Sequence, residues 1–155
     1  MYNVSDTAGW GSLPAGGAKI GAPRDQPFRA EPSVIAVIDD DASIRVATDS
    51  LLRSRGYTVY TFESAEEFLR SPQLNETSCV ITDVRMPTMT GIKLQALLRA
   101  QGYRVSFIFI TGFPEKSSRE RAMKAGATCF LTKPFDAQIL IKCVETALRT
   151  HPESG

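Results

Sequence analysis

The chain has 155 residues, enough for one domain with a buried core, and 43% of them are hydrophobic. Its 18 basic and 17 acidic side chains give a formal net charge of +1, so nothing indicates a positively charged surface for nucleic acid. No apolar run reaches the length of a membrane span and the N-terminus lacks the pattern of a signal peptide, so we expect a soluble, cytoplasmic protein.

Composition divides the chain near residue 31. Residues 1–31 hold five glycines and three prolines without an apolar period, which predicts a flexible arm. Residues 32–150 alternate apolar runs with segments of helical period and form the predicted domain, and residues 151–155 form a short C-terminal tail.

Strands and helices are predicted in strict alternation along the domain. The strands are recognised by short apolar or alternating runs, and the helices by one apolar face. In chain order the elements are strand 34–38, helix 44–55, strand 57–62, helix 65–69, strand 79–82, helix 91–101, strand 105–110, helix 117–125, strand 128–132 and helix 137–148.

Several helix ends carry their own signals. Ser64 and Glu67 have the spacing of a capping box, and Asp136 is placed to cap the last helix. Gly56 follows the first helix, where a left-handed C-terminal cap favours glycine. These signals agree with the boundaries that the periodicity predicts.

Five strands and five helices in this order predict an α/β fold with a doubly wound parallel sheet. Crossovers of this length require parallel pairing, and right-handed connections place helices on both faces. In such sheets, sites lie outside the carboxyl ends of the strands. Those ends are therefore where functional side chains are expected.

Three cysteines form an odd set without the spacing of a metal site. Cys79 and Cys129 fall in predicted strands and Cys143 in a predicted helix. We interpret them as small buried packing groups in a reducing compartment.

Reactive side chains follow four of the predicted strands. Each has an ordinary alternative, because an acid at a strand end often caps the next helix and a threonine there often only favours the strand. Their joint placement instead favours a pocket for a cation and a phosphoryl group. The residues are Asp39, Asp40 and Asp41 after the first strand, Asp83 after the third, Thr111 after the fourth and Lys133 after the fifth.

The residue types support phosphoryl chemistry. Asp39, Asp40 and Asp83 would raise one another's pKa unless a cation lay between them. Mg²⁺ prefers such oxygen ligands together with phosphate, and Mn²⁺ would be able to replace it. Asp83 would then attack phosphorus and form an aspartyl phosphate. Lys133 and Thr111 would bind the phosphoryl oxygens.

These motifs resemble the receiver domain of two-component response regulators over residues 33–150. Within that family, Arg85-Met86-Pro87 and the segment 122–127 are most similar to receivers of the nitrogen-fixation and transcription-regulator type. The resemblance implies a flavodoxin-like fold with strand order 2-1-3-4-5. The matching segments are Ile38–Asp41, Thr82–Pro87, Met89–Gly91, Ile110–Gly112, Ala122–Ala127 and Lys133–Phe135.

The resemblance implies a phosphorylation site and its metal ligands. Asp83 corresponds to the phosphoacceptor, Asp40 to a direct Mg²⁺ ligand and Asp39 to the acid that holds a metal-bound water. The backbone carbonyl of Arg85 is expected as a further ligand, beside Asp83 itself. The backbones of Arg85 and Gly112 are expected to contact the phosphoryl group.

The resemblance also implies the switch residues. Thr111 corresponds to the hydroxyl that moves toward the phosphoryl group, and Lys133 to the lysine that pairs with it. Phe130 occupies the aromatic switch position, where the family often has tyrosine. The Lys133–Pro134 bond is expected to be cis.

The implied function is two-component phosphorelay signalling. A histidine kinase or histidine phosphotransfer protein would phosphorylate Asp83, and the face formed by the fourth helix, fifth strand and fifth helix would change. The protein would catalyse its own phosphorylation and dephosphorylation without being a turnover enzyme. Its expected partner is a downstream protein, an output domain absent from this chain, or a second copy through that face, with no nucleic-acid or membrane contact. Residues 151–155 contain no helix-turn-helix, which fits either a stand-alone receiver or part of a longer regulator.

Two alternatives remain from the sequence. A phosphatase of the haloacid dehalogenase type would use Asp39 as its nucleophile in Asp39-x-Asp41-x-Ser43, with Lys133 in its third motif. That reading lacks a late acidic pair of metal ligands and leaves Asp83 unexplained. A pseudo-receiver that only binds partners would be expected to lack one of the matched site residues.

Overall fold

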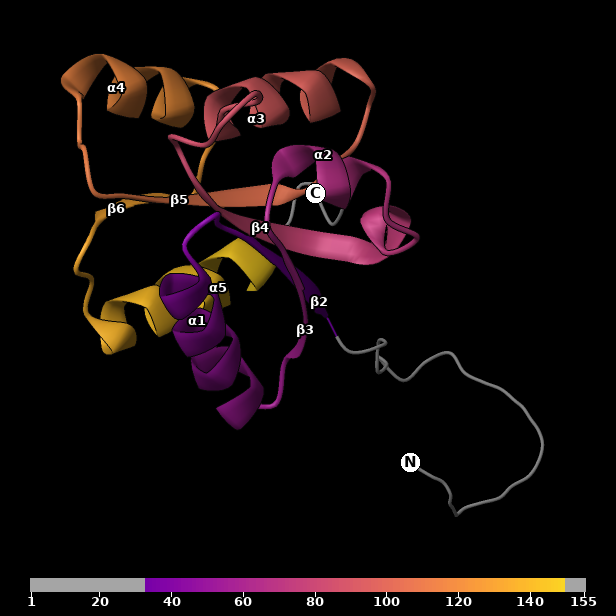
Figure 1. The fold of residues 1–155 in the computed structure, drawn as a ribbon, viewed down its shortest axis with the longest axis vertical. Helices are drawn as coiled ribbons and strands as arrows, with labels where there is room; N and C mark the ends of the chain where they lie inside the picture. The colour runs from indigo at the N-terminus through magenta and orange to yellow at the C-terminus, as the bar shows by residue number, and fades with distance from the viewer. Residues whose placement is uncertain (1–32, 150–155) are drawn as a thin grey trace. The chain divides into compact units, whose positions relative to one another are not determined.

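Five strands form one parallel sheet in the order β3-β2-β4-β5-β6 (Figure 1). The structure is a computed structural model that describes residues 33–149. Counted along the chain, the order is 2-1-3-4-5, which confirms the expected fold. The strands are β2 Val34–Ile38, β3 Thr58–Phe62, β4 Thr77–Asp83, β5 Ser106–Thr111 and β6 Cys129–Thr132.

Five helices cover the two faces of the sheet (Figure 1). Helices α2, α3 and α4 lie on one face, and α1 and α5 lie on the other. The predicted elements are confirmed to within a few residues, and a short 3₁₀ helix, η1 Leu74–Glu76, was not predicted. The helices are α1 Ala42–Ser54, α2 Ala65–Leu69, α3 Gly91–Ala100, α4 Lys116–Lys124 and α5 Ala137–Arg149. No helix in the described range is both long and apolar enough to span a membrane.

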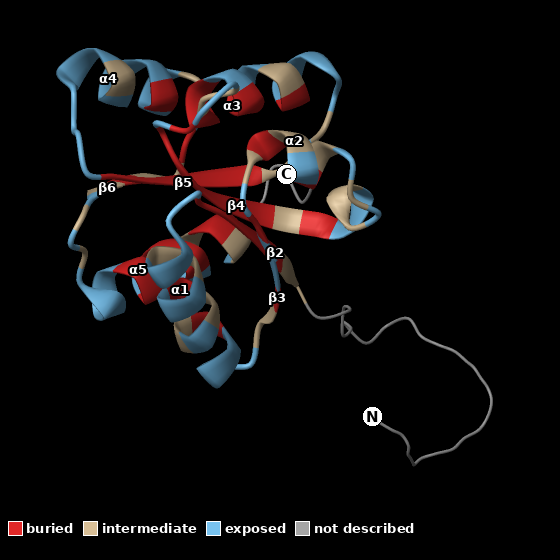
Figure 2. Ribbon diagram, viewed as in Figure 1, coloured by how far each residue is buried: buried red, intermediate tan, exposed pale blue. Residues whose placement is uncertain are grey.

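Burial explains why strands and helices have different sequence patterns. Every residue of β5 is buried, since helices cover the central strands on both sides, and the four residues between Ser106 and Thr111 are all apolar. The helices bury one stripe and expose the rest (Figure 2). One core lies under α2, α3 and α4 and contains Phe68 and Leu94, while a second under α1 and α5 contains Leu52 and Leu140.

Local capping fixes where the helices begin. The Ser64 hydroxyl accepts a hydrogen bond from the Glu67 amide at 3.1 Å, as the capping box predicts. Asp136 accepts from the Gln138 amide at 2.7 Å at the start of α5. The Thr90 hydroxyl caps α3 by accepting from the Lys93 amide at 3.1 Å.

The interpretation of the cysteines is wrong for two of the three. Cys129 on β6 and Cys143 on α5 are joined by a disulfide across 14 residues of sequence. Cys79 is the free thiol that was expected, with no exposed surface, and its burial raises the pKa to about 12. The predicted arm over residues 1–31 and the tail over 151–155 lie outside the described residues.

Gly91, the first residue of α3, lies against the end of β4. A Cβ atom at this position would clash with the backbone carbonyl oxygen of Asp83 and crowd the Phe109 ring at 3.1 Å. The absence of a side chain therefore lets α3 start directly beside the strand end that carries Asp83.

We predict that Gly91→Ala lowers the free energy of unfolding by about 1–3 kcal/mol, because the new methyl group must displace backbone. Urea unfolding of the purified chain measures this change. Gly112→Ala is the matched control, since a Cβ there meets nothing within 4 Å. Equal stability of the two variants would show that the close contact at Gly91 is not a real constraint.

Candidate functional site

Strand register brings the predicted residues to one edge of the sheet. Ile38 pairs with Thr82 on the neighbouring strand. Asp39 and Asp83 each directly follow one of these paired residues, so they lie side by side. Thr111 ends β5 and pairs with Thr132, and the Lys133 amide donates to the Thr111 carbonyl at 2.8 Å. The carboxyl ends of β2, β4, β5 and β6 therefore meet, as the sequence predicted.

Three carboxylates cluster at this edge. Ligand oxygens of Asp39, Asp40 and Asp83 all lie within 4.8 Å of one another. Asp39 and Asp83 are buried, with 3% and 7% of their surface exposed, whereas Asp40 is exposed. Asp40 therefore closes the group from the solvent side.

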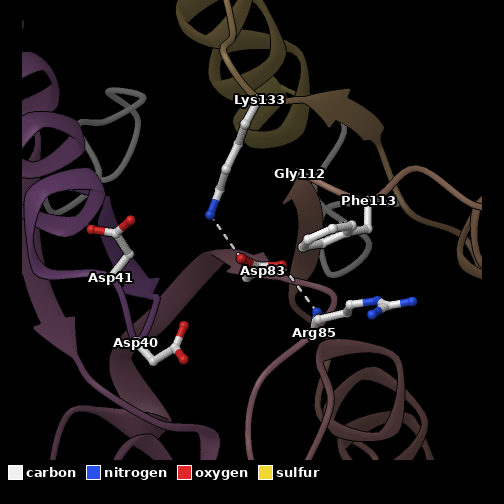
Figure 3. A pocket seen from close by; sticks show the side chains of 7 residues that line it. All are labelled: Asp40, Asp41, Asp83, Arg85, Gly112, Phe113 and Lys133. Atoms are coloured by element: carbon white, nitrogen blue, oxygen red, sulfur yellow. Dashed lines mark hydrogen bonds and ion pairs between the residues drawn. The ribbon is translucent and has the colours of Figure 1, made fainter.

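Lys133 lies among these acids and neutralises part of their charge. Its Nζ donates to Asp83 Oδ2 at 2.7 Å (Figure 3). The same Nζ lies 3.1 Å from Asp39 Oδ2. Burial disfavours the charged amine, but the bonds to Asp83 and Asp39 outweigh that cost, so the pKa of Lys133 is raised. The amine is thus held as a cation at the base of the site.

The charged form of the Asp39 carboxyl is unfavourable in the folded protein. Burial raises the pKa of its carboxyl, while the hydrogen bond from the Asp41 amide and the contact with Lys133 oppose that shift without cancelling it. The Asp41 amide donates to Asp39 Oδ1 at 2.9 Å. Asp39 is fixed in place and favours additional positive charge nearby.

Asp83 faces an open pocket of about 510 Å³. The second oxygen of its carboxylate, Oδ1, accepts a hydrogen bond from the Arg85 amide at 3.0 Å, which fixes the plane of the group (Figure 3). Asp39 is not among the lining residues and instead borders a small cavity beneath. The pocket is lined by Asp40, Asp41, Asp83, Arg85, Gly112, Phe113 and Lys133.

Of the three predicted switch residues, Lys133 lines the pocket, whereas Thr111 and Phe130 do not. Thr111 has no exposed surface, and its Oγ1 accepts a hydrogen bond from the Phe113 amide at 3.1 Å. Phe130 is buried, with its ring centroid 6.1 Å from that of Phe109. The Lys133–Pro134 peptide bond is cis, as expected.

Asp41 has a structural role at this edge. Its Oδ1 accepts from the Ser43 hydroxyl at 2.8 Å and the Ser43 amide at 3.0 Å, so it is the N-cap of α1. These hydrogen bonds hold the pKa of Asp41 below its usual value. Asp41 and Ser43, which are the second acid and the hydroxyl residue of the phosphatase-like motif, are therefore hydrogen bonded to each other in the helix cap.

One side of the pocket rim was not predicted. The Arg85 guanidinium lies 4.8 Å from the centre of the Phe113 ring and pairs with Glu115 at 2.7 Å. Phe113 is 64% exposed. Phe113 directly follows Thr111-Gly112, so the sequence did contain a signal for an aromatic residue at this rim. Its contact with Arg85 was not predictable, because it joins segments about 30 residues apart.

The donor set fits a magnesium ion. Three carboxylates and one ammonium leave two negative charges when all are ionised, which matches one divalent cation. Asp40 and Asp83 present oxygens to the pocket, where water and phosphate oxygens have room to complete the coordination.

We predict that Asp39→Asn stabilises the protein at pH 7 in EDTA by about 1 kcal/mol, as substitutions at strained sites often do. The native state holds the Asp39 proton more tightly than the unfolded chain. The loss of stability caused by burying the charged Asp39 carboxylate is therefore absent below pH 3.8. It grows as the pH rises from there through the raised pKa. Urea unfolding with EDTA or Mg²⁺ tests this, and Mg²⁺ should stabilise the wild type more than the variant.

Asp41→Asn is the matched control. The fold favours the ionised form of Asp41, so this variant should lose stability. Loss of stability in Asp39→Asn as well would contradict the account of a buried, charge-strained Asp39.

Comparisons with known proteins identify the family of the chain. The sequence model of the response regulator receiver domain matches residues 35–145. Response regulator protein TodT of Pseudomonas putida is 40% identical over 121 residues, 78% of this chain and 53% of TodT. Transcriptional regulatory protein FixJ of Bradyrhizobium diazoefficiens is 39% identical over 115 residues, 74% of this chain and 56% of FixJ. The chain spans about half the length of these relatives.

Solved structures give the same result. The response regulator StyR superposes with a TM-score of 0.71 at 40% identity, over 80% of this chain and 63% of that one. The crystal structure titled FixJ-N superposes with a TM-score of 0.69 at 30% identity, over 77% of this chain and 96% of that one. This chain therefore belongs to the family of response regulator receiver domains.

Proposed function

We propose that this receiver accepts a phosphoryl group on Asp83 in a Mg²⁺-dependent reaction and signals through its α4–β6–α5 face. The observation that carries the proposal is the placement of Asp83 in an open pocket, hydrogen bonded to Lys133 and within reach of two further carboxylates. The donor is a phosphohistidine of a kinase or phosphotransfer protein.

Asp83 is oriented for in-line attack on phosphorus. The Arg85 amide and the Lys133 ammonium each hold one carboxylate oxygen, so the group presents its lone pairs in a fixed plane. Attack forms a carboxylate O–P bond while the P–N bond to the donor imidazole breaks, and the imidazole leaves with the bonding pair. A bound Mg²⁺ would neutralise the acids and polarise the phosphoryl oxygens.

Lys133 then changes partner. In the unmodified protein its ammonium contacts oxygens of Asp83 and Asp39. Once Asp83 carries a phosphoryl group, the nearest strong acceptors are the new oxygens, and a charge-assisted hydrogen bond to one of them stabilises the transferring group. The proposed positions around the metal are Asp39, Asp40, Asp83 and the backbone carbonyl of Arg85.

The switch starts from the present contacts of Thr111. Thr111 is the last residue of β5, and its hydroxyl oxygen accepts a hydrogen bond from the Phe113 amide. Phosphoryl oxygens at Asp83 offer this hydroxyl a stronger, charged acceptor. Movement of Thr111 changes the packing beside Phe130, which biases two arrangements of the α4–β6–α5 face.

The remaining expectations follow as parts of the same proposal. The domain acts as a signalling module that promotes its own phosphorylation and dephosphorylation, in the cytoplasm. Its upstream partner is a histidine kinase or phosphotransfer protein, and its downstream partner is a protein, an output domain or a second copy. The phosphatase alternative is not supported, because the chain belongs to the receiver family and the structure uses Asp41 and Ser43 in a helix cap.

We predict that acetyl phosphate with Mg²⁺ adds one acid-labile phosphate to the wild-type chain, on Asp83. Intact-mass spectrometry and peptide mapping after borohydride trapping identify the residue. Asp83→Asn should abolish the label, because its amide is not a competent nucleophile. A label that persists in Asp83→Asn, or that maps to Asp39, would refute the proposal.

Lys133→Gln should change metal binding and phosphoryl transfer in opposite directions. Loss of a positive charge beside the acids should raise Mg²⁺ affinity about fivefold. Loss of the donor that stabilises the phosphoryl oxygens should lower the labelling rate about 100-fold. Calorimetric Mg²⁺ titration and the rate of acetyl phosphate labelling measure the two effects.

Lys116→Gln is the control for Lys133→Gln, since Lys116 is 88% exposed on α4 and should change neither value appreciably. A parallel fall of affinity and rate in Lys133→Gln would indicate general damage to the site instead of the proposed role.

A further inference from the structure

The Cys129–Cys143 disulfide lies inside the face proposed to transmit the signal. It joins β6 to α5, with Cα atoms 6.2 Å apart. Cys129 is half-buried and Cys143 is 6% exposed, in the core that lies under α1 and α5. The bond therefore fixes two of the three elements of this face to each other.

The neighbouring residue on β6 is Phe130, which points to the opposite side of the sheet. Its ring packs against Phe109 in the core under α2, α3 and α4. Arg119 on α4 holds it from outside, with its guanidinium 5.9 Å from the ring centre and Nη1 donating to the Phe130 carbonyl at 3.3 Å. Strand β6 is thus held by α4 through Phe130 and by α5 through Cys129.

Strand β6 is a part of the sheet where such attachments have a large effect. It has four residues and, within the described part of the chain, lies at an edge and pairs with β5 alone. An edge strand with one ladder of hydrogen bonds depends on its side-chain contacts to keep its position. A covalent bond from Cys129 to α5 therefore limits how far the backbone beside Phe130 can move.

We propose that Cys129 and Cys143 are a reversible redox site, and that their disulfide restrains the rearrangement of the α4–β6–α5 face. A disulfide in a cytoplasmic protein meets a reducing thiol pool, so a pair there opens and closes with the redox state. The regulatory part and the cytoplasmic setting rest on the proposed function, whereas the formation of the bond between Cys129 and Cys143 does not.

The oxidant we propose is a low-molecular-weight disulfide such as oxidised glutathione. The Cys129 thiolate, the more exposed of the two, attacks one glutathione sulfur, and the other glutathione leaves as a thiolate. The Cys143 thiolate then attacks the Cys129 sulfur of the mixed disulfide and releases the second glutathione. The two cysteines lose two protons and two electrons, which the glutathione disulfide gains, and excess reduced glutathione reverses both steps.

Cys79 provides an internal reference. It is fully buried in β4, and burial raises the pKa of its thiol to about 12, so almost none of it is thiolate near neutral pH. It should remain a thiol under both conditions, and maleimide should label it after unfolding.

The first experiment counts thiols in the full chain after equilibration with oxidised or reduced glutathione. The protein is denatured in acid, labelled with maleimide and examined by peptide mass spectrometry. We expect one label, on Cys79, and a linked Cys129–Cys143 peptide after oxidation, and three labels after reduction. Three labels under both conditions, or glutathione left on separate cysteines, would overturn the redox site.

Thermal unfolding gives a second readout of the bond. Closing a loop of this length should raise the midpoint of the oxidised protein by about 10 °C over the reduced form. The double variant Cys129→Ser/Cys143→Ser removes both thiols and should show no difference between the two glutathione conditions. A difference that persists in this double variant would assign the effect to another group.

The coupling is tested by NMR with beryllofluoride and Mg²⁺, which mimic the phosphorylated state. We expect shift changes of Phe130 and α5 resonances to be at least twofold smaller in the oxidised than in the reduced protein, and equal under both conditions in the double variant Cys129→Ser/Cys143→Ser. Equal responses of the oxidised and reduced wild type would overturn the coupling. If neither form binds beryllofluoride, the proposed function fails together with the coupling, while the thiol count still decides the redox site.

Discussion

The pairing of β2 beside β4 is the constraint on which the site depends, because it places the residues after Ile38 and Thr82 side by side. Two carboxylates that the sequence separates by more than 40 residues are thereby held at one buried edge, with Asp40 near them. Like charges at this range are unfavourable, and Lys133 offsets one of the three. The negative charge that remains is the basis of the proposed divalent-cation site.

The surrounding fold keeps this arrangement rigid while leaving its output side adjustable. Gly91 lets α3 begin against the carbonyl of Asp83, and the Arg85 amide fixes the carboxylate itself. By contrast, β6 is short and lies at the edge of the described sheet, where α4 holds it through Phe130 and α5 holds it through Cys129. A charge change at Asp83 therefore arises in a firmly held site, and the proposed response depends on these few side-chain attachments of β6.

Sequence reasoning predicted the sheet, its strand ends and the residues gathered there, for a physical reason. Buried parallel strands need continuous apolar runs, and the chain places Asp39, Asp83, Thr111 and Lys133 where those runs stop. The separate roles of the acidic triplet were not predictable to the same degree. Whether Asp40 or Asp41 caps α1 depends on backbone positions that only the fold defines. The same holds for the Cys129–Cys143 bond and the Arg85 contacts, which join segments distant in sequence.

The central claim is that Asp39, Asp40 and Asp83 form one divalent-ion site. The most direct test is a crystal structure of the full chain with Mn²⁺, located by its anomalous scattering. The account predicts one ion in the pocket, with oxygens of Asp40 and Asp83 at about 2.2 Å and Asp39 reaching it directly or through one water. An ion bound away from these three residues, or none at millimolar Mn²⁺, would contradict it.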